Sequence, residues 1–366
     1  ETAKERKIQM EWSSNEKTAM EAALGMSYAG KRSMVAMKHV GLNVAADSFI
    51  NSAITGVNGG LIVVAADDPS MHSSQNEQDS RFYGKFAFVP CFEPSDQQEA
   101  YDMVIDGFEL SEKYKVPVLL RITTRLAHSR AAVRQVREPA PQKKLKLPED
   151  PVQFVLLPAL ARKKYRALLT TYESMRYDIR LSKYNHFKDN KKRDLGIITC
   201  GIAYNYLMEN ISETSHGYPV LKICTYPFPK DLILEITERC KEVLILEEGY
   251  PVIEEGLRGI LDCGIKILGR LDGTVPRDGE LNPSIVAKAL GMPVSHGKKV
   301  PELVRMRPPS FCKGCGHADM FNALIEAIKP YGIGRVFSDI GCYTLGALPP
   351  YNAINACVDM GASITM

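Results

Sequence analysis

One run of the sequence, Leu61-Ile62-Val63-Val64-Ala65-Ala66-Asp67, is apolar at every position before its final aspartate. A strand with one solvated face alternates apolar and polar residues, whereas a parallel strand covered on both faces is apolar throughout. The run therefore predicts a parallel strand buried between helices. Val118–Ile122 is the next predicted strand, and Pro117 precedes it, where a missing N–H is tolerated. A predicted helix, Asp96–Tyr114, lies between these two strands.

The same alternation continues in both directions along the chain. Asn15 caps a predicted helix that extends through Tyr28, and Ser33–Lys38 is the next predicted strand. Helices that alternate with apolar strands imply crossover connections and parallel sheets, so we predict an α/β protein with several doubly wound parallel-sheet domains. In a second block the predicted strands are Leu195–Thr199, Val220–Cys224, Glu242–Leu246 and Ile265–Leu268, and the predicted helices lie near Tyr204–Ile211, Lys230–Cys240, Pro251–Leu261 and Asn282–Leu290.

These elements divide the chain into four predicted parts. Residues 1–135 form the first α/β domain and residues 194–296 the second. Residues 136–193 are a linker that contains a basic helical arm, Leu160–Tyr184, and a charged turn, His186–Arg193. Residues 297–366 begin a third α/β block.

Composition excludes several classes of function. The 366 residues are 45% apolar and carry a net charge of +3, which does not indicate a nucleic-acid or membrane partner. No apolar run approaches the roughly 18–20 residues that span a bilayer. The chain does not begin with Met, so we expect a fragment of a longer protein. Apolar surroundings predict buried free thiols, typical of the reducing cytoplasm, at Cys91, Cys200, Cys224, Cys240, Cys263 and Cys357.

The segment Cys312-Lys313-Gly314-Cys315-Gly316-His317 places two thiols at C-x-x-C spacing in a glycine-rich turn, and Cys342 follows after one helix-length of chain. Dispersed thiols of this kind suit an iron–sulfur cluster. A zinc site and plain or redox-active thiols remain open, since zinc is the common occupant of C-x-x-C but no second C-x-x-C is present.

Three features of the first block could carry chemistry. Glu16 lies in the first turn of a predicted helix, where a simple N-terminal charge is the alternative, and spacing does not separate it from Glu11 and Glu21. His39 follows a predicted strand and could be an acid, a base or a structural residue. The polar stretch 67–81 is either a mobile surface loop or a binding loop.

These motifs together resemble a known family. Residues Glu11–Lys17, Met37–Asp47 and the polar stretch 67–81 look like the alpha subunit of the indolepyruvate type among thiamine-diphosphate-dependent 2-oxoacid:ferredoxin oxidoreductases. Residues 312–317 and 339–342 resemble the start of the diphosphate-binding domain. The resemblance implies, in order along the chain, a pyrimidine-binding domain, a transketolase C-terminal-like domain and an incomplete pyrophosphate-binding domain.

The resemblance also implies roles for individual residues. Glu16 matches the glutamate that hydrogen-bonds N1′ of the aminopyrimidine, and His39 is a second catalytic candidate. His72, Gln75, Asn76 and Arg81 are candidates for the substrate side. The other implied cofactor-binding residues are Gly41, Gly314, Gly316, His317, Asp339, Gly341 and Cys342, and the implied [4Fe–4S] ligands are Cys312, Cys315 and Cys342.

The activity implied by the resemblance is oxidative decarboxylation of aryl pyruvates to acyl-CoA, with electron transfer to ferredoxin. Thiamine diphosphate, Mg²⁺ and [4Fe–4S] clusters are the implied cofactors, although the family's magnesium motif and ferredoxin-like domain would follow residue 366. A smaller beta subunit and a homo-oligomer of alpha subunits are the expected partners. The alternatives are a relative acting on pyruvate, a branched-chain oxoacid or 2-oxoglutarate, and a non-catalytic fragment that pairs with a partner subunit.

Overall fold

The computed structural model describes residues 5, 8–135, 144–146, 148, 150, 153–211, 217–258, 265–276, 279–294, 297–305, 309–331, 336–338, 341–354 and 356–357. The chain forms two compact units, Glu1–Val294 and Ser295–Met366. The first two α/β blocks of the sequence therefore pack together as one unit, and the third block is separate.

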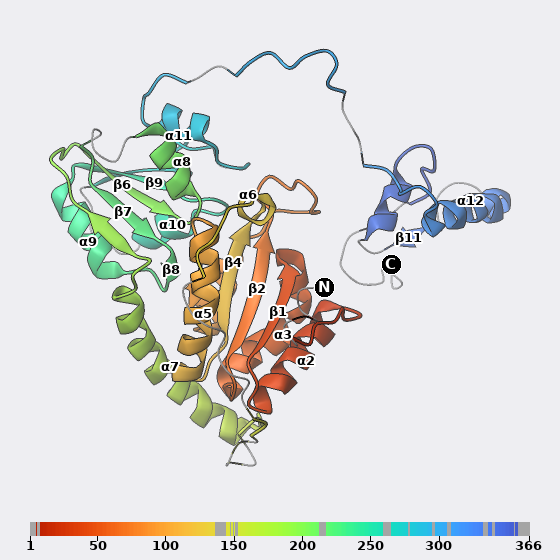
Figure 1. The fold of residues 1–366 in the computed structure, drawn as a ribbon, viewed down its shortest axis with the longest axis horizontal. Helices are drawn as coiled ribbons and strands as arrows, with labels where there is room; N and C mark the ends of the chain where they lie inside the picture. The colour runs from red at the N-terminus through yellow and green to blue at the C-terminus, as the bar shows by residue number, and fades with distance from the viewer. Residues whose placement is uncertain are drawn as a thin grey trace. The chain divides into compact units, whose positions relative to one another are not determined.

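The first sheet contains the buried strands that the sequence predicts. Its strand order is β1 (Ser33–Lys38), β2 (Leu61–Asp67), β4 (Val118–Thr123), β3 (Cys91–Phe92) and β8 (Thr225–Tyr226). All neighbours are parallel except β3 and β8, which pair in antiparallel fashion. Figure 1 shows β1, β2 and β4 side by side. The order confirms the predicted parallel sheet and adds one strand from the second block.

Helices on both faces explain why β2 is apolar throughout. Leu61, Val63 and Ala65 belong to the core cluster that includes residues of α2 (Glu16–Tyr28) and α3 (His39–Thr55). Ile62 and Val64 belong to a second cluster with residues of α5 (Gln97–Tyr114). Successive side chains of a strand point to opposite faces, so each helical layer covers every other residue.

Helix α3 is not predicted from the sequence. Its ten buried residues include the polar Ser48, Ser52 and Thr55, whereas Ile50 and Ile54 are only partly buried. When buried and apolar positions do not coincide, the one-sided apolar periodicity from which helices are recognised is weak.

The second block forms its own sheet, with strand order β10 (Lys266–Leu268), β9 (Glu242–Leu246), β6 (Leu195–Cys200), β7 (Val220–Ile223) and β5 (His186–Lys188). Its first four strands confirm the prediction and pair in parallel. The predicted charged turn at 186–193 is wrong in part, because β5 is an antiparallel edge strand. Its first and last residues, His186 and Lys188, are polar and exposed, so the sequence pattern resembles that of a turn. The helices are α8 (Ala203–Asn210), α9 (Lys230–Arg239), α10 (Val252–Arg258) and α11 (Pro283–Ala289).

Three further helices complete the first unit: α4 (Arg81–Ala87), α6 (Thr124–His128) and α7 (Pro158–Arg180). Helix α7 is the predicted basic arm. It buries Leu168, Met175 and Ile179, so it packs on the body of the unit and is not simply a solvated connection.

The second unit contains α12 (Gly316–Ile328), η1 (Lys329–Tyr331), β11 (Phe337–Ser338), η2 (Cys342–Ala347) and β12 (Ala356–Cys357). The two short strands are parallel. The ring of Phe321 is buried and stacks on Phe311, with their centroids 5.8 Å apart, and Tyr351 packs against both.

Two predictions from composition can be compared with the described residues. Cys91, Cys200, Cys224 and Cys240 are buried free thiols, as predicted, whereas Cys263 and the side chain of Cys357 lie outside the described residues. Within the described part of the chain, none of the helices combines the length and apolar character that crossing a membrane requires.

Candidate active site

Glu16 is distinguished from its rivals by what it contacts. Glu16 is the first residue of α2. Asn15 caps this helix, because its side chain accepts a 2.9 Å hydrogen bond from the Thr18 N–H. Glu11 and Glu21 are exposed, and Glu21 lies 4.0 Å from Lys17, whereas Glu16 is half-buried. The structure therefore selects Glu16 as the carboxylate that faces another element.

That element is the first turn of α3. A Cβ added to Gly41 would lie 2.5 Å from Cγ and 2.9 Å from Oε1 of Glu16, so only glycine leaves room for the glutamate. The backbone N–H groups at a helix N-terminus have no partner within the helix and favour negative charge nearby. Glu16 and Gly41, which the resemblance assigns to one cofactor, are thus in contact.

His39 begins α3 at the carboxyl end of β1. Its side chain is 1% exposed. Nδ1 lies 3.3 Å from the carbonyl oxygen of Ala66, and Nε2 lies 3.1 Å from that of Asn76. Both ring nitrogens therefore contact backbone acceptors, and His39 ties the end of β2 to the polar loop, residues 68–80. In this arrangement His39 positions the loop.

The polar loop is organised by its own acidic residues. The carboxylate of Asp68 accepts hydrogen bonds from the N–H groups of His72 (3.2 Å) and Ser73 (2.8 Å) and from the Thr124 hydroxyl (2.7 Å). Burial opposes ionisation of Asp68, but these hydrogen bonds outweigh it and lower its pKa to about 2. Glu77 accepts a 2.9 Å hydrogen bond from the Ser70 N–H. This internal capping favours a formed loop over a mobile one.

The four substrate-side candidates fall into two groups that differ in solvent exposure. His72, Gln75 and Asn76 are exposed, and Nε2 of His72 lies 3.2 Å from Glu280 of the second block. Arg81 is 2% exposed, and its guanidinium donates to Asp79, Glu247, the Tyr226 hydroxyl and the Tyr250 carbonyl. The structure thus brings the first three to the surface and encloses Arg81 among protein partners.

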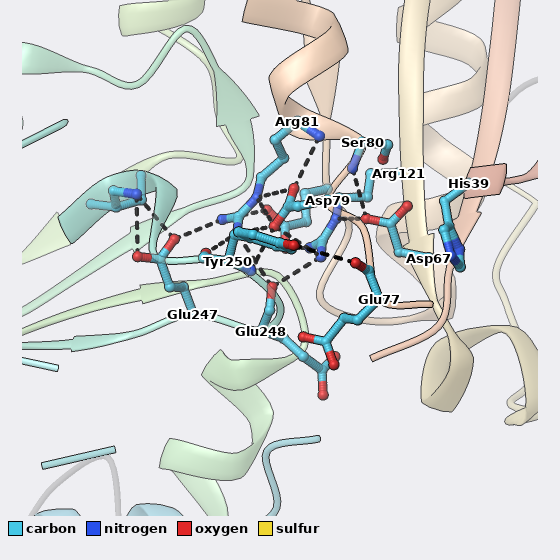
Figure 2. A network of polar contacts seen from close by, with 12 residues as sticks. His39, Asp67, Glu77, Asp79, Ser80, Arg81, Arg121, Glu247, Glu248 and Tyr250 are labelled. Atoms are coloured by element: carbon cyan, nitrogen blue, oxygen red, sulfur yellow. Dashed lines mark hydrogen bonds and ion pairs between the residues drawn. The ribbon is translucent and has the colours of Figure 1, made fainter. Parts of the chain in front are cut away.

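A buried ionic network connects the two blocks where the carboxyl ends of β2, β4 and β9 meet, and Figure 2 shows its members. Arg121 of β4 is fully buried. It donates to Asp67 (2.6 Å), to Glu93 and to the Glu248 carbonyl oxygen (2.9 Å). Buried charges of this kind are tolerated only when they are paired and hydrogen-bonded.

The network holds more acids than bases. The side chains of Arg81 and Arg121 contact the carboxylates of Asp67, Asp79, Glu93 and Glu247, all at most 4% exposed. Glu248 adds a fifth buried carboxylate, and among the described residues neither of its side-chain oxygens has a hydrogen-bond partner in good geometry. Burial raises the pKa of Glu248 to about 7, although Arg121 and the Thr123 side chain oppose the shift. Glu248 therefore gains a proton near neutral pH.

Replacing Glu248 with Gln is expected to make stability less dependent on pH. Because the pKa of Glu248 is higher in the folded than in the unfolded chain, its contribution is fully present below the unfolded value and is lost as pH rises through about 7. The loss amounts to about 3 kcal/mol. Glu248→Gln should therefore gain free energy of unfolding relative to the wild type between pH 5 and pH 8, measured by urea denaturation. The exposed Glu255→Gln should show no such gain, and parallel wild-type and Glu248→Gln curves would contradict the assignment.

In the second unit, two of the three predicted thiols lie close to one histidine. Nδ1 of His317 lies 3.4 Å from the sulfur of Cys315 and 3.5 Å from that of Cys342. Cys312 is exposed and belongs to the same turn, closed by a 3.1 Å hydrogen bond from the Cys315 N–H to its carbonyl oxygen. Within the described residues, no three His, Cys, Asp or Glu side chains surround a single metal ion.

Of the two glycines in this turn, only Gly314 has a backbone conformation that requires glycine. Gly314 has φ +75°, and an added Cβ on Gly314 or Gly316 would meet nothing within 4 Å, so both face open space. Gly316 begins α12, whose N-terminal N–H groups can bind an anion. Gly341 packs against the ring of Tyr343. Asp339 lies outside the described residues.

Most residues of the buried network are not predicted from the sequence. Asp79, Glu93, Arg121, Glu247 and Glu248 are not among the candidate residues. The available signals were an arginine inside the apolar run Val118–Thr123 and two glutamates directly after β9, since a charge in a covered strand needs a buried partner.

The fold has a counterpart among solved structures. A 2-oxoglutarate:ferredoxin oxidoreductase from Magnetococcus marinus superposes with a TM-score of 0.61 over 79% of this chain and 58% of that chain, at 16% identity. This similarity places the chain in the same α/β fold class. Residues 1–184 match the family of pyruvate flavodoxin/ferredoxin oxidoreductases, in its thiamine-diphosphate-binding part, and the chain belongs to this family.

Curated relatives are more similar to the chain in sequence than this solved structure is. The chain is 42% identical to the indolepyruvate oxidoreductase subunit IorA of Methanothermobacter marburgensis, over 99% of this chain and 61% of that protein. It is 43% identical to the subunit of the same name from Pyrococcus abyssi, over 98% of this chain and 58% of that protein. The chain therefore spans about three-fifths of the length of the curated relatives it matches.

Proposed function

We propose that the complete subunit represented by this chain oxidises aryl 2-oxoacids of the indolepyruvate type. In this reaction the carboxylate leaves as CO₂, coenzyme A takes the acyl group, and two electrons pass to ferredoxin. The chain's family and its roughly 42% identity to indolepyruvate oxidoreductase subunits support the proposal. The name of these relatives as a subunit supports a smaller beta subunit as partner, alongside a homo-oligomer of this subunit. The buried free thiols are consistent with the cytoplasm as its location.

The observation that carries the proposal is the contact between Glu16 and Gly41. A half-buried carboxylate at the start of one helix lies over a glycine in the first turn of the next, within the matched thiamine-diphosphate-binding region. Thiamine diphosphate, when bound, supplies the electron sink for decarboxylation. Glu16 would hydrogen-bond N1′ of the pyrimidine and hold a proton there, while Gly41 leaves the space that this carboxylate occupies.

The exposed face of the polar loop supports a role on the substrate side. His72, Gln75 and Asn76 offer imidazole and amide groups that can orient a 2-oxoacid carboxylate. His39 holds this loop against β2 through the Asn76 carbonyl oxygen, so we assign it to positioning. Arg81 would not contact the substrate; its guanidinium would hold Asp79, and with it the end of the polar loop, in place.

The second unit would contribute to binding of the diphosphate. The open glycine turn at 314–316 and the N-terminus of α12 offer backbone N–H groups to an anion. His317, Gly341 and Cys342 lie beside this turn and remain candidates, as does Asp339.

The same turn is suited to a [4Fe–4S] cluster. Its donor set is three cysteine thiols, Cys312, Cys315 and Cys342, two of which converge on His317. A four-iron cluster distributes its ligands over a body larger than one ion, so it does not require a single-ion arrangement. We expect the complete enzyme, purified without oxygen, to show broad visible absorbance that bleaches on reduction and decreases in Cys342→Ser. Unchanged absorbance and iron content in Cys342→Ser would exclude this cysteine as a ligand.

The substrate is tested with the complete subunit and its partner, supplied with thiamine diphosphate, Mg²⁺ and coenzyme A. Reduction of a viologen dye should depend on coenzyme A and should be fastest with indolepyruvate and other aryl pyruvates. If kcat/KM is higher with pyruvate, a branched-chain oxoacid or 2-oxoglutarate than with aryl pyruvates, that compound belongs to the true substrate class. No reduction with any 2-oxoacid would favour a non-catalytic, subunit-pairing role.

A further inference from the structure

A cavity lies within the first unit, and none of the roles described above explains it. It has a volume of about 380 Å³ and is formed where α4, α7, the connection from β8 to α9 and the start of α10 meet. Cavities of this size commonly hold small organic molecules. Glu16, Gly41 and the exposed loop residues His72, Gln75 and Asn76 are not among its lining residues.

The walls of the cavity are aromatic and held in place. The ring of Tyr172 packs edge-on against Phe88, with centroids 5.2 Å apart. The ring of Phe228 is packed so closely on α10 that a Cβ added to Gly256 would lie 2.8 Å from its Cζ. Tyr226 and Val252 add buried apolar surface. Fixed aromatic rings from separate elements favour a flat, apolar ligand body.

The charged groups around the cavity are all positive. Lys85, Arg176 and Lys230 contribute to the lining, and the lining residues include no Asp or Glu. Arg176 pairs with Glu173 at 3.0 Å. Lys85 and Lys230 are exposed, and neither forms an ion pair in the described part of the chain. Arg81 also lines the cavity, but its charge is already matched by Asp79 and Glu247. Two unmatched ammonium groups beside an aromatic cavity suit one carboxylate better than a polyphosphate.

We propose that this cavity binds an aromatic carboxylate, with its ring among Tyr172, Tyr226 and Phe228 and its carboxylate paired with Lys85 and Lys230. The site is separate from the one that contains Glu16, so it does not depend on the proposed reaction. Its occupant touches Arg81, which also binds Asp79 at the end of the polar loop and Glu247 of the second block. Binding there therefore stabilises the contact between the two blocks.

The test uses the complete subunit with its partner and 5-fluoroindole-3-acetate, a probe that carries a carboxylate but no 2-oxo group to react. Fluorine NMR titration should resolve a saturable bound signal from this cavity, distinct from any signal of the probe on the substrate side. Binding should weaken about tenfold or more in Lys85→Met/Lys230→Met, because both charge-assisted contacts are lost. Lys85→Arg/Lys230→Arg should retain binding, and so should Lys288→Met, which removes an exposed lysine from α11. Glu16→Gln should also retain it, which separates this site from the candidate active site.

Three results would overturn the proposal. The first is the absence of saturable binding to the wild type. The second is that neutral 5-fluoroindole binds the wild type as tightly as the acetate probe does, or that the Lys85→Met/Lys230→Met variant binds the probe as tightly as the wild type does. Either result would mean that the carboxylate contributes nothing to binding. The third is displacement of the probe by ATP at lower concentration than by phenylacetate, which would indicate a nucleotide site. Lys85 and Lys230 are exposed, so the unliganded variants should unfold at the wild-type temperature, and this measurement accompanies each titration.

Discussion

Glu16→Gln is expected to lower the turnover of aryl pyruvates by about 10²-fold or more, because an amide cannot exchange the proton that a carboxyl group holds at N1′. Glutamine keeps the size of the side chain and its place over Gly41, so the free energy of unfolding should stay close to the wild-type value. Turnover is measured as coenzyme A-dependent viologen reduction by the complete enzyme.

Two comparisons make this result specific to Glu16. Glu21→Gln removes an exposed carboxylate from the same helix and should leave turnover unchanged. Gly41→Ala should also impair turnover while Glu16 itself is intact, because the new methyl group would displace the glutamate side chain. Full activity of Glu16→Gln would contradict the assignment of Glu16 to N1′ of the pyrimidine. The proposed reaction would then lose its main structural support.

Arg121→Met is expected to destabilise the first unit by about 3–5 kcal/mol, the usual cost of leaving buried charges without their partner. Arg121 is fully buried and binds Asp67 at 2.6 Å, together with Glu93 and the Glu248 carbonyl oxygen. Methionine fills much of the same volume but supplies no donor. Since domains are stable by about 5–15 kcal/mol, the loss would be visible as a lower urea midpoint.

A nearby arginine provides the matched control. Arg125 pairs with Glu280; the arginine side chain is 55% exposed and the glutamate side chain is 10% exposed. A pair with one partner in solvent contributes less than a fully buried one, so Arg125→Met should destabilise the unit by less than Arg121→Met does. A loss below about 1 kcal/mol in Arg121→Met would mean that the buried acids take up protons or water without cost.

The fold was largely predictable because its signals are local. The apolar run at β2 implied cover on both faces, and α2 and α3 on one face and α5 on the other provide it. Helix α3 escaped prediction because its buried and its apolar positions do not coincide: Ser48 and Ser52 are buried, whereas Ile50 is only partly buried.

The candidate site was less predictable because its contacts are distant in sequence. Spacing alone could not separate Glu16 from Glu11 and Glu21. The resemblance singled it out, and the structure adds the contact with Gly41. Arg81 illustrates the limit: its partners Tyr226 and Glu247 lie far along the chain and become neighbours only when the two blocks pack.

The two-residue strand β8 has a consequence for how this protein folds. Thr225 and Tyr226 pair with Phe92 and Cys91, so the first sheet acquires its last strand only after the chain has been made beyond residue 226. Until then the outer edge of β3 is open to pairing with another chain. Completion of the sheet therefore involves loop closure over more than a hundred residues, and we expect the two blocks to unfold together.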